Sequence, residues 1–129
     1  LLLITHGTLG ADMLHTVREI LCGCPLPAES LAIDSDADTD ELYQAASDLC
    51  TQLDNGDGVL VLTDLYGSTP SNIANRLADS HNVNVISGVN IPMLLRILNY
   101  HDMGLEALAE KAASGARDGI VVTSRQQAS

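Results

Sequence analysis

The sequence has 129 residues, 46% of them hydrophobic, and contains no Phe or Trp and only three Tyr. This length predicts one domain over residues 1–129, with a core of aliphatic side chains. A formal net charge of −11 disfavours nucleic acid and anionic membranes as partners, because both are bound by basic surfaces. No apolar run approaches the roughly 18–20 residues of a membrane span, so we expect contact with membrane components only through partner proteins.

Apolar runs alternate with segments of helical periodicity along the whole chain. In chain order, the pattern predicts a strand over 1–5, a helix over 9–22, a strand over 30–33, a helix over 39–53, a strand over 59–63, a helix from Thr69, a strand over 82–87, a helix over 91–100, a helix over 104–115, a strand over 119–123 and a frayed tail over 125–129.

The three cysteines point to a reducing compartment. Cys22, Cys24 and Cys50 are an odd number, and no secretory leader precedes them, which favours free thiols in the cytoplasm. The Cys22-Gly23-Cys24 spacing could belong to a metal site, but no second ligand pair follows. We therefore predict no metal ion and no other cofactor.

The alternation of strands and helices predicts an α/β fold, a doubly wound and mainly parallel sheet with helices on both faces. With the strand order 2-1-3-4, strands one and three are neighbours, and the helices that follow them leave to opposite faces. Ligands of such folds bind in the crevice at the carboxyl ends of those two strands. His6 ends strand one and Asp64 ends strand three, so both are expected at this crevice.

A histidine beside a carboxylate can act as a nucleophile toward phosphorus. The carboxylate accepts the proton of one ring nitrogen, leaves the other nitrogen free to attack, and stabilises the positive ring that forms. No Lys or Arg lies in the two loops concerned. A phosphate would instead bind the N–H groups where the helix opened by Thr69-Pro70-Ser71 begins, with Gly67 allowing close approach and the Ser68 and Thr69 hydroxyls as further donors.

Each of these residues could also have an ordinary structural role. A strand-end histidine is often a surface residue, Asp64 could be a turn residue, and Ser68 or Thr69 could cap the helix. The convergence of separate loops on one crevice favours the catalytic interpretation. The remaining histidines lack this convergence, and we expect structural or solvated roles for His15, His81 and His101.

Three segments are distinctive when taken together: Ile4-Thr5-His6-Gly7, residues 62–72 (Leu-Thr-Asp-Leu-Tyr-Gly-Ser-Thr-Pro-Ser-Asn) and residues 87–94 (Ser-Gly-Val-Asn-Ile-Pro-Met-Leu). In this order they resemble the enzyme IIA domain of the mannose family (mannose/fructose/sorbose type) of the bacterial phosphoenolpyruvate-dependent sugar phosphotransferase system. The similarity extends over essentially the whole chain. The third segment is the most specific to this family, whereas Thr-His-Gly alone would be weak evidence for it.

The resemblance implies that His6 accepts phosphate from the phosphocarrier HPr and passes it to a IIB component, and that Asp64 orients His6. It implies a homodimer completed by exchange of an antiparallel C-terminal strand, here residues 119–123. It places the turn with Thr69 beside the phosphate. The crevice would be lined by Gly7, Tyr66, Gly88, Val89 and Asn90, of which Asn90 could also cap the next helix.

Two other functions stay open. Enteric mannose-type proteins join IIA to IIB, whereas this chain carries one domain, so it could be a regulatory phosphorylation-state sensor in a truncated system without sugar transport. A phosphodonor subunit of a dihydroxyacetone-kinase-type system would share the fold. It typically carries Met-Gly-Ser after the strand-three aspartate, in place of the Gly-Ser-Thr-Pro at 67–70 here, and therefore ranks lower.

Overall fold

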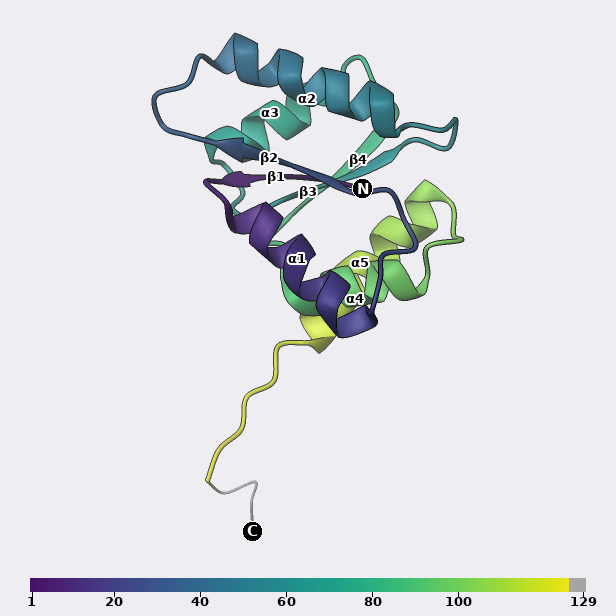
Figure 1. The fold of residues 1–129 in the computed structure, drawn as a ribbon. Helices are drawn as coiled ribbons and strands as arrows, with labels where there is room; N and C mark the ends of the chain where they lie inside the picture. Colours follow the sequence, from purple (N-terminus) through teal and green to yellow (C-terminus); the bar gives the residue numbers. More distant parts are fainter. Residues whose placement is uncertain (126–129) are drawn as a thin grey trace.

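The strands lie side by side in one parallel sheet in the computed structural model, which describes residues 1–125 (Figure 1). Their order is β2-β1-β3-β4, and every neighbouring pair is parallel. The predicted order 2-1-3-4 is therefore confirmed. The strands are β1 (Leu2–His6), β2 (Glu29–Ile33), β3 (Val59–Thr63) and β4 (Val83–Ser87).

Helices cover both faces of the sheet, as the alternation of elements predicts. In Figure 1, α2 (Thr39–Leu53) and α3 (Thr69–Leu77) lie above the sheet. Below it lie α1 (Leu9–Leu21), α4 (Ile91–Asn99) and α5 (Leu105–Asp118). All of these described helices are too short or too polar to cross a lipid bilayer.

The core forms two apolar layers because successive strand residues point to opposite faces of the sheet. Leu1 and Leu3 pack into the layer shared with α1, α4 and α5. Leu2 and Ile4 pack into the layer shared with α2 and α3. β1 is thus buried on both faces, which explains its unbroken apolar sequence and fixes the position of its last residue, His6.

The C-terminal prediction is wrong for the single chain. α5 continues to Asp118 rather than ending near residue 115, and Gly119 caps it. The segment 120–124 then leaves the fold as an extended, exposed stretch and forms no strand (Figure 1). Its β-branched residues suit a strand, but a strand needs a neighbour, and the segment runs away from the sheet edge of its own chain. The predicted frayed tail lies, beyond Arg125, outside the described residues.

Close contact between α4 and α5 explains why α5 runs through Gly115. A Cβ atom on Gly115 would lie 2.6 Å from Cβ of Arg96, and one on Gly119 would overlap Pro92. Both glycines are therefore packing positions of the helix pair, and Gly115 lies within α5 and does not mark its end. As a result, the C-terminus of α5 lies beside the N-terminus of α4, which follows β4.

Candidate functional site

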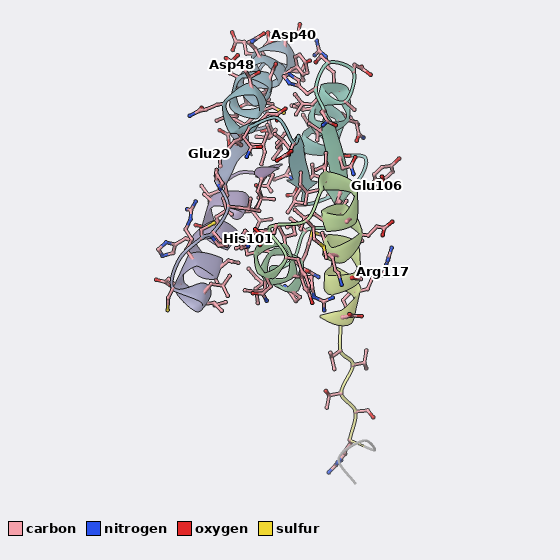
Figure 2. The ribbon with its side chains drawn as sticks, turned by 90° about the vertical axis from the view of Figure 1, so that its right-hand side faces the viewer. Glu29, Asp40, Asp48, His101, Glu106 and Arg117 are labelled. Atoms are coloured by element: carbon pink, nitrogen blue, oxygen red, sulfur yellow. The ribbon has the colours of Figure 1, made fainter. Side chains whose placement is uncertain are left out.

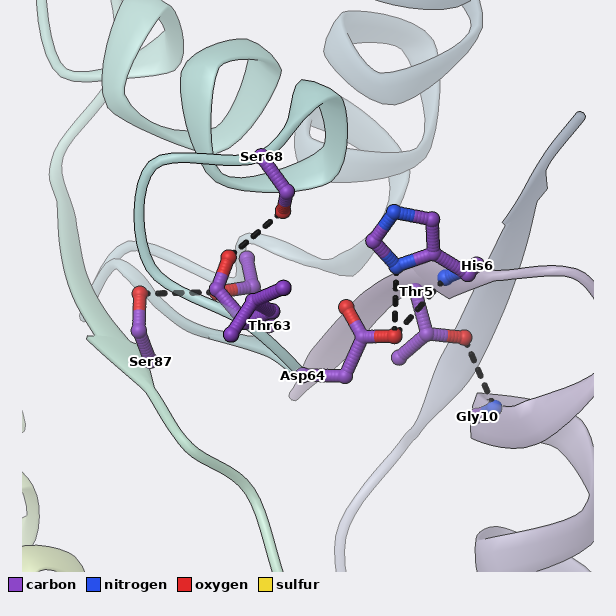
Figure 3. Close-up of polar contacts among 8 residues, drawn as sticks. Thr5, His6, Gly10, Thr63, Asp64, Ser68 and Ser87 are labelled. Carbon is purple, nitrogen blue, oxygen red and sulfur yellow. Dashed lines mark hydrogen bonds and ion pairs between the residues drawn. The ribbon is translucent and has the colours of Figure 1, made fainter. Parts of the chain in front are cut away.

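His6 and Asp64 meet where β1 and β3 end side by side. Nδ1 of His6 lies 2.8 Å from Oδ2 of Asp64, and the backbone N–H of His6 donates to the same oxygen at 3.1 Å (Figure 3). The His6 side chain is 52% exposed, while that of Asp64 is only 12% exposed. The carboxylate therefore holds the ring from inside the fold and leaves its outer edge open to a partner.

This contact selects the tautomer of the histidine. An ionised carboxylate can only accept hydrogen bonds, so Nδ1 of His6 must carry the proton that it shares with Asp64. In the neutral ring Nε2 is then the unprotonated nitrogen, and its lone pair points away from Asp64. The site thus presents a nucleophilic nitrogen at the surface with a carboxylate behind it.

Asp64 remains ionised although it is largely buried. Burial alone would raise its pKa, but the hydrogen bonds donated by the His6 ring and by the His6 backbone N–H outweigh burial and hold the pKa below its usual value. Its other oxygen, Oδ1, is buried without a hydrogen-bond partner among the described residues. The charge of Asp64 therefore depends on His6 and favours the positive ring that forms when Nε2 gains a substituent.

A glycine turn carries the chain from His6 into α1. Gly7 has a φ of +52°, in the left-handed region that favours glycine, and its N–H donates to the carbonyl of Ile33 on β2 at 3.1 Å. This turn fixes the backbone on the helix side of His6 and ties it to the neighbouring strand.

The turn after Asp64 leads into α3 without a side-chain cap. Gly67 has a φ of +81°, and the hydroxyl of Ser68, the N-cap residue, donates back to the carbonyl of Leu65 (Figure 3). Among the residues that the structure describes, no side chain caps the start of α3 by a hydrogen bond. The N–H groups at this end of the helix consequently keep their capacity to bind an anion.

The predicted phosphate ligands occupy different depths around this turn. Thr69 is exposed at the first position of α3, and Tyr66 is 79% exposed. Ser71 is completely buried, and its hydroxyl accepts the N–H of Gly67 at 3.3 Å. Ser71 thus supports the turn from below, and its side chain does not face the crevice.

The segment after β4 forms the third side of the crevice. Gly88, with a φ of +91°, and Val89 both donate their N–H groups to the carbonyl of Thr63, at 2.9 and 3.0 Å. Asn90 caps α4, because its Oδ1 accepts the N–H of Met93 at 2.9 Å, and its Nδ2 donates to the carbonyl of Ala116. The capping role predicted for Asn90 is confirmed, and the segment joins β3, α4 and α5 into one unit.

The contacts of the other histidines fit the structural or solvated roles expected for them. His15 lies 3.4 Å from Glu19 on α1, His81 contacts the hydroxyl of Ser47 at 2.8 Å, and His101 contacts the carbonyl of Leu98 at 3.0 Å. Of the Lys and Arg side chains in the described part of the chain, none forms an ion pair with Asp64.

Thr5 and Thr63 were not predicted as functional residues. Each is buried, with exposed fractions of 1% and 0%, and each immediately precedes a residue of the pair. A signal for them exists in the sequence. In each case a threonine ends an apolar run of the sequence and directly precedes His6 or Asp64.

With this geometry in place, comparison with known proteins identifies the family. The model of the family described as EIIA-man, PTS system fructose IIA component, matches residues 1–113. The chain belongs to this IIA family. It is also 31% identical over 119 residues to the PTS system mannose-specific EIIAB component of Escherichia coli strain K12, and to that of Shigella flexneri. The match covers 90% of this chain and 36% of those proteins, so the chain spans about a third of their length.

Solved structures share the fold of this IIA chain. The mannose/sorbose specific IIA subunit of the phosphotransferase system from Enterococcus faecalis superposes with a TM-score of 0.85 at 19% identity, covering 95% of this chain and 92% of that one. The phosphotransferase system component EIIA from Streptococcus agalactiae gives a TM-score of 0.81 at 23% identity, covering 94% of each chain. At these identities the likeness establishes the α/β fold.

The predicted family is therefore confirmed. The family is that of the IIA components of sugar phosphotransferase systems, which are phosphoryl carriers that work through a phosphohistidine. This identification favours the carrier function over the regulatory and dihydroxyacetone-kinase alternatives.

Proposed function

We propose that His6 is the residue that carries the phosphoryl group and that Asp64 orients it. The observation that carries this proposal is the 2.8 Å contact between Nδ1 of His6 and Oδ2 of Asp64 beneath an exposed ring. Nε2 of His6 attacks the phosphorus atom of a donor phosphohistidine, and the donor's P–N bond breaks as the new P–N bond forms. The His6 ring then carries a positive charge, which the Asp64 carboxylate balances.

The transferred phosphoryl group would be held mainly by backbone donors. The uncapped start of α3 supplies N–H groups, Gly67 allows them a close approach, and Thr69 adds an exposed hydroxyl. Positioning and charge stabilisation are most of what phosphoryl transfer requires, so a site without arginine is sufficient. In this proposal Ser71 acts only through the turn that it supports, and Gly7, Tyr66, Gly88, Val89 and Asn90 surround the phosphate.

The donor and acceptor in this proposal are HPr and a IIB component. The charge of −11 suits a partner with a basic face, which would be steered toward this surface at low salt. Figure 2 shows carboxylates such as Glu29, Asp40, Asp48 and Glu106 at the outside of the fold, and all four residues are exposed. A cytoplasmic location is part of the proposal, since Cys22, Cys24 and Cys50 are free thiols, which suit a reducing compartment.

A homodimer also belongs to the proposal, with residues 1–129 acting as a single IIA-type domain in each copy. Ile120, Val121 and Val122 are 71–77% exposed on a segment that leaves the fold, and β4 is an edge strand of the sheet. Pairing of this segment with a second copy would bury the three side chains and complete the exchanged strand.

Labelling with phosphate tests the role of His6 directly. The protein is incubated with labelled phosphoenolpyruvate, enzyme I and HPr, and the wild type is expected to gain an acid-labile, base-stable phosphate. His6→Ala should lose the label, while His15→Ala, which removes a histidine on α1 that is 75% exposed, should keep it. Retention of the label by His6→Ala would reject the assignment. Transfer of the phosphate from this protein to a sugar-specific IIB protein would support the carrier function, and its absence would support the regulatory function.

A further inference from the structure

Buried polar side chains occur in one place in the described structure. Those of Thr5, Thr63 and Ser71 are 1%, 0% and 0% exposed, and all three adjoin the elements of the crevice. A hydroxyl in an apolar core is unfavourable unless it forms hydrogen bonds, and valine would fill the same volume without that requirement. The hydrogen bonds of these hydroxyls therefore indicate what they do.

Thr5 ties the end of β1 to the start of α1. Its Oγ1 accepts the N–H of Gly10 at 2.8 Å (Figure 3). The helix lies so close to the strand that a Cβ atom on Gly10 would be 3.0 Å from Oγ1 of Thr5 and 3.2 Å from Cβ of Leu3. The turn that contains His6 is thus anchored at both ends, by the strand before it and by the helix after it.

Thr63 ties the end of β3 to the end of β4. Its Oγ1 donates to the hydroxyl of Ser87 at 2.8 Å (Figure 3). Its carbonyl accepts the N–H groups of Gly88 and Val89. The residue before Asp64 is therefore held by groups from the neighbouring strand and from the turn that follows it. Both members of the reacting pair follow a threonine that is fixed by its own hydroxyl.

We propose that Thr5 and Thr63 are positioning residues that hold His6 and Asp64 in hydrogen-bond contact during phosphoryl transfer. The inference rests on the proposed role of His6. Each hydroxyl restrains the backbone directly before one residue of the pair, so the loss of either one changes the separation of the ring and the carboxylate. A displacement on the order of 1 Å at a reacting group is enough to slow a reaction by about a hundredfold.

The test compares Thr5→Val and Thr63→Val, which keep the side-chain shape, with Thr5→Ser and Thr63→Ser, which keep the hydroxyl. Val59→Ala, at the opposite end of β3 where Val59 is 1% exposed, is the control for lost core packing. Three properties are measured on folded protein: the rate of labelling from phospho-HPr, the ¹⁵N chemical shifts of the His6 ring, and the pKa of the Asp64 carboxyl by ¹³C NMR. If Thr5→Val does not fold, Thr63→Val carries the test.

The valine variants are expected to transfer phosphate at least about tenfold more slowly. They should also show altered ring shifts and a higher pKa of Asp64, because the hydrogen bonds from His6 weaken. The serine variants should recover most of the rate, and Val59→Ala should keep the wild-type rate and titration. Wild-type values in both valine variants would overturn the proposal, as would equal effects in Val59→Ala. If the wild type is not labelled at His6, the proposed function fails, while the ring shifts and the Asp64 titration still test positioning.

Discussion

His6 and Asp64 are 58 positions apart in the chain, yet Nδ1 of one lies 2.8 Å from Oδ2 of the other. The strand order β2-β1-β3-β4 brings them together, because it makes β1 and β3 neighbours and ends both at the same edge of the sheet. The pair therefore exists only in the folded chain. Its charge, its tautomer and its exposure can each be tested by experiment.

Replacing Asp64 by Asn should slow the phosphorylation of His6 by about 10²–10⁴-fold. The amide has nearly the same shape, but it carries no charge and can present its NH₂ group to Nδ1, which would favour the wrong tautomer. The rate of labelling from phospho-HPr measures the effect. Asp57→Asn, in an exposed turn, is the matched control and should label at the wild-type rate. An equal rate in Asp64→Asn would show that the carboxylate is not needed.

The contribution of Asp64 to stability should disappear in acid. Its pKa in the folded protein is lower than the ordinary value of 3.8, so the folded state binds its proton less readily than the unfolded state does. The stabilisation is complete above the unfolded pKa and is lost as the pH falls through the folded pKa. Urea unfolding of the wild type and Asp64→Asn should therefore differ more at pH 7 than at pH 3. A difference independent of pH would contradict this prediction.

The three thiols should react in order of exposure. Burial raises the pKa of Cys50, which is completely buried, and the nearby Asp54 adds to this effect, so its reactive thiolate is scarce. Cys22 is exposed at the end of α1, and Cys24 is half-buried with its thiol directed at the carbonyl of Leu26. A disulfide reagent should modify Cys22 first in the native protein and Cys50 only after denaturation.

Cys22→Ser supplies the control for this order, because it should remove the fastest phase of the reaction and leave the others unchanged. Rapid modification of Cys50 in the native protein would mean that the layer beneath α2 opens readily.

Gly115→Ala should destabilise the protein by about 1–3 kcal/mol. Alanine is the better helix former by about 1 kcal/mol, but its Cβ would lie 2.6 Å from Cβ of Arg96 and would push α5 away from α4. Gly104→Ala is the matched control, since a Cβ there would meet no atom of the described residues within 4 Å, its two chain neighbours aside. Its effect on the free energy of unfolding should stay below about 1 kcal/mol. A stabilised Gly115→Ala protein would show that the two helices can separate at no cost.

The periodicity of the sequence predicted β1 to β4 and the first four helices closely, because each buries a continuous apolar face. His6 and Asp64 could be placed together because the strand order follows from the alternation of elements. The end of α5 could not be predicted from the sequence. A glycine near the end of a helical pattern often marks the helix end, whereas Gly115 lies inside α5 and packs against Arg96. The roles of Thr5 and Thr63 depend on bonds to Gly10 and Ser87, which only the folded arrangement reveals.

The central position of β1 has a consequence for synthesis of the chain. β1 is made before its neighbour β3, which begins only at Val59, after α1, β2 and α2 have been made. Until then one side of β1 offers unpaired backbone groups next to the fully apolar Leu2–Ile4 stretch, which invites pairing with other chains. The pairing of β1 with β3 closes a long loop and is therefore slower than the formation of local contacts. The nascent protein is therefore most prone to aggregate in the interval before residues 59–63 emerge.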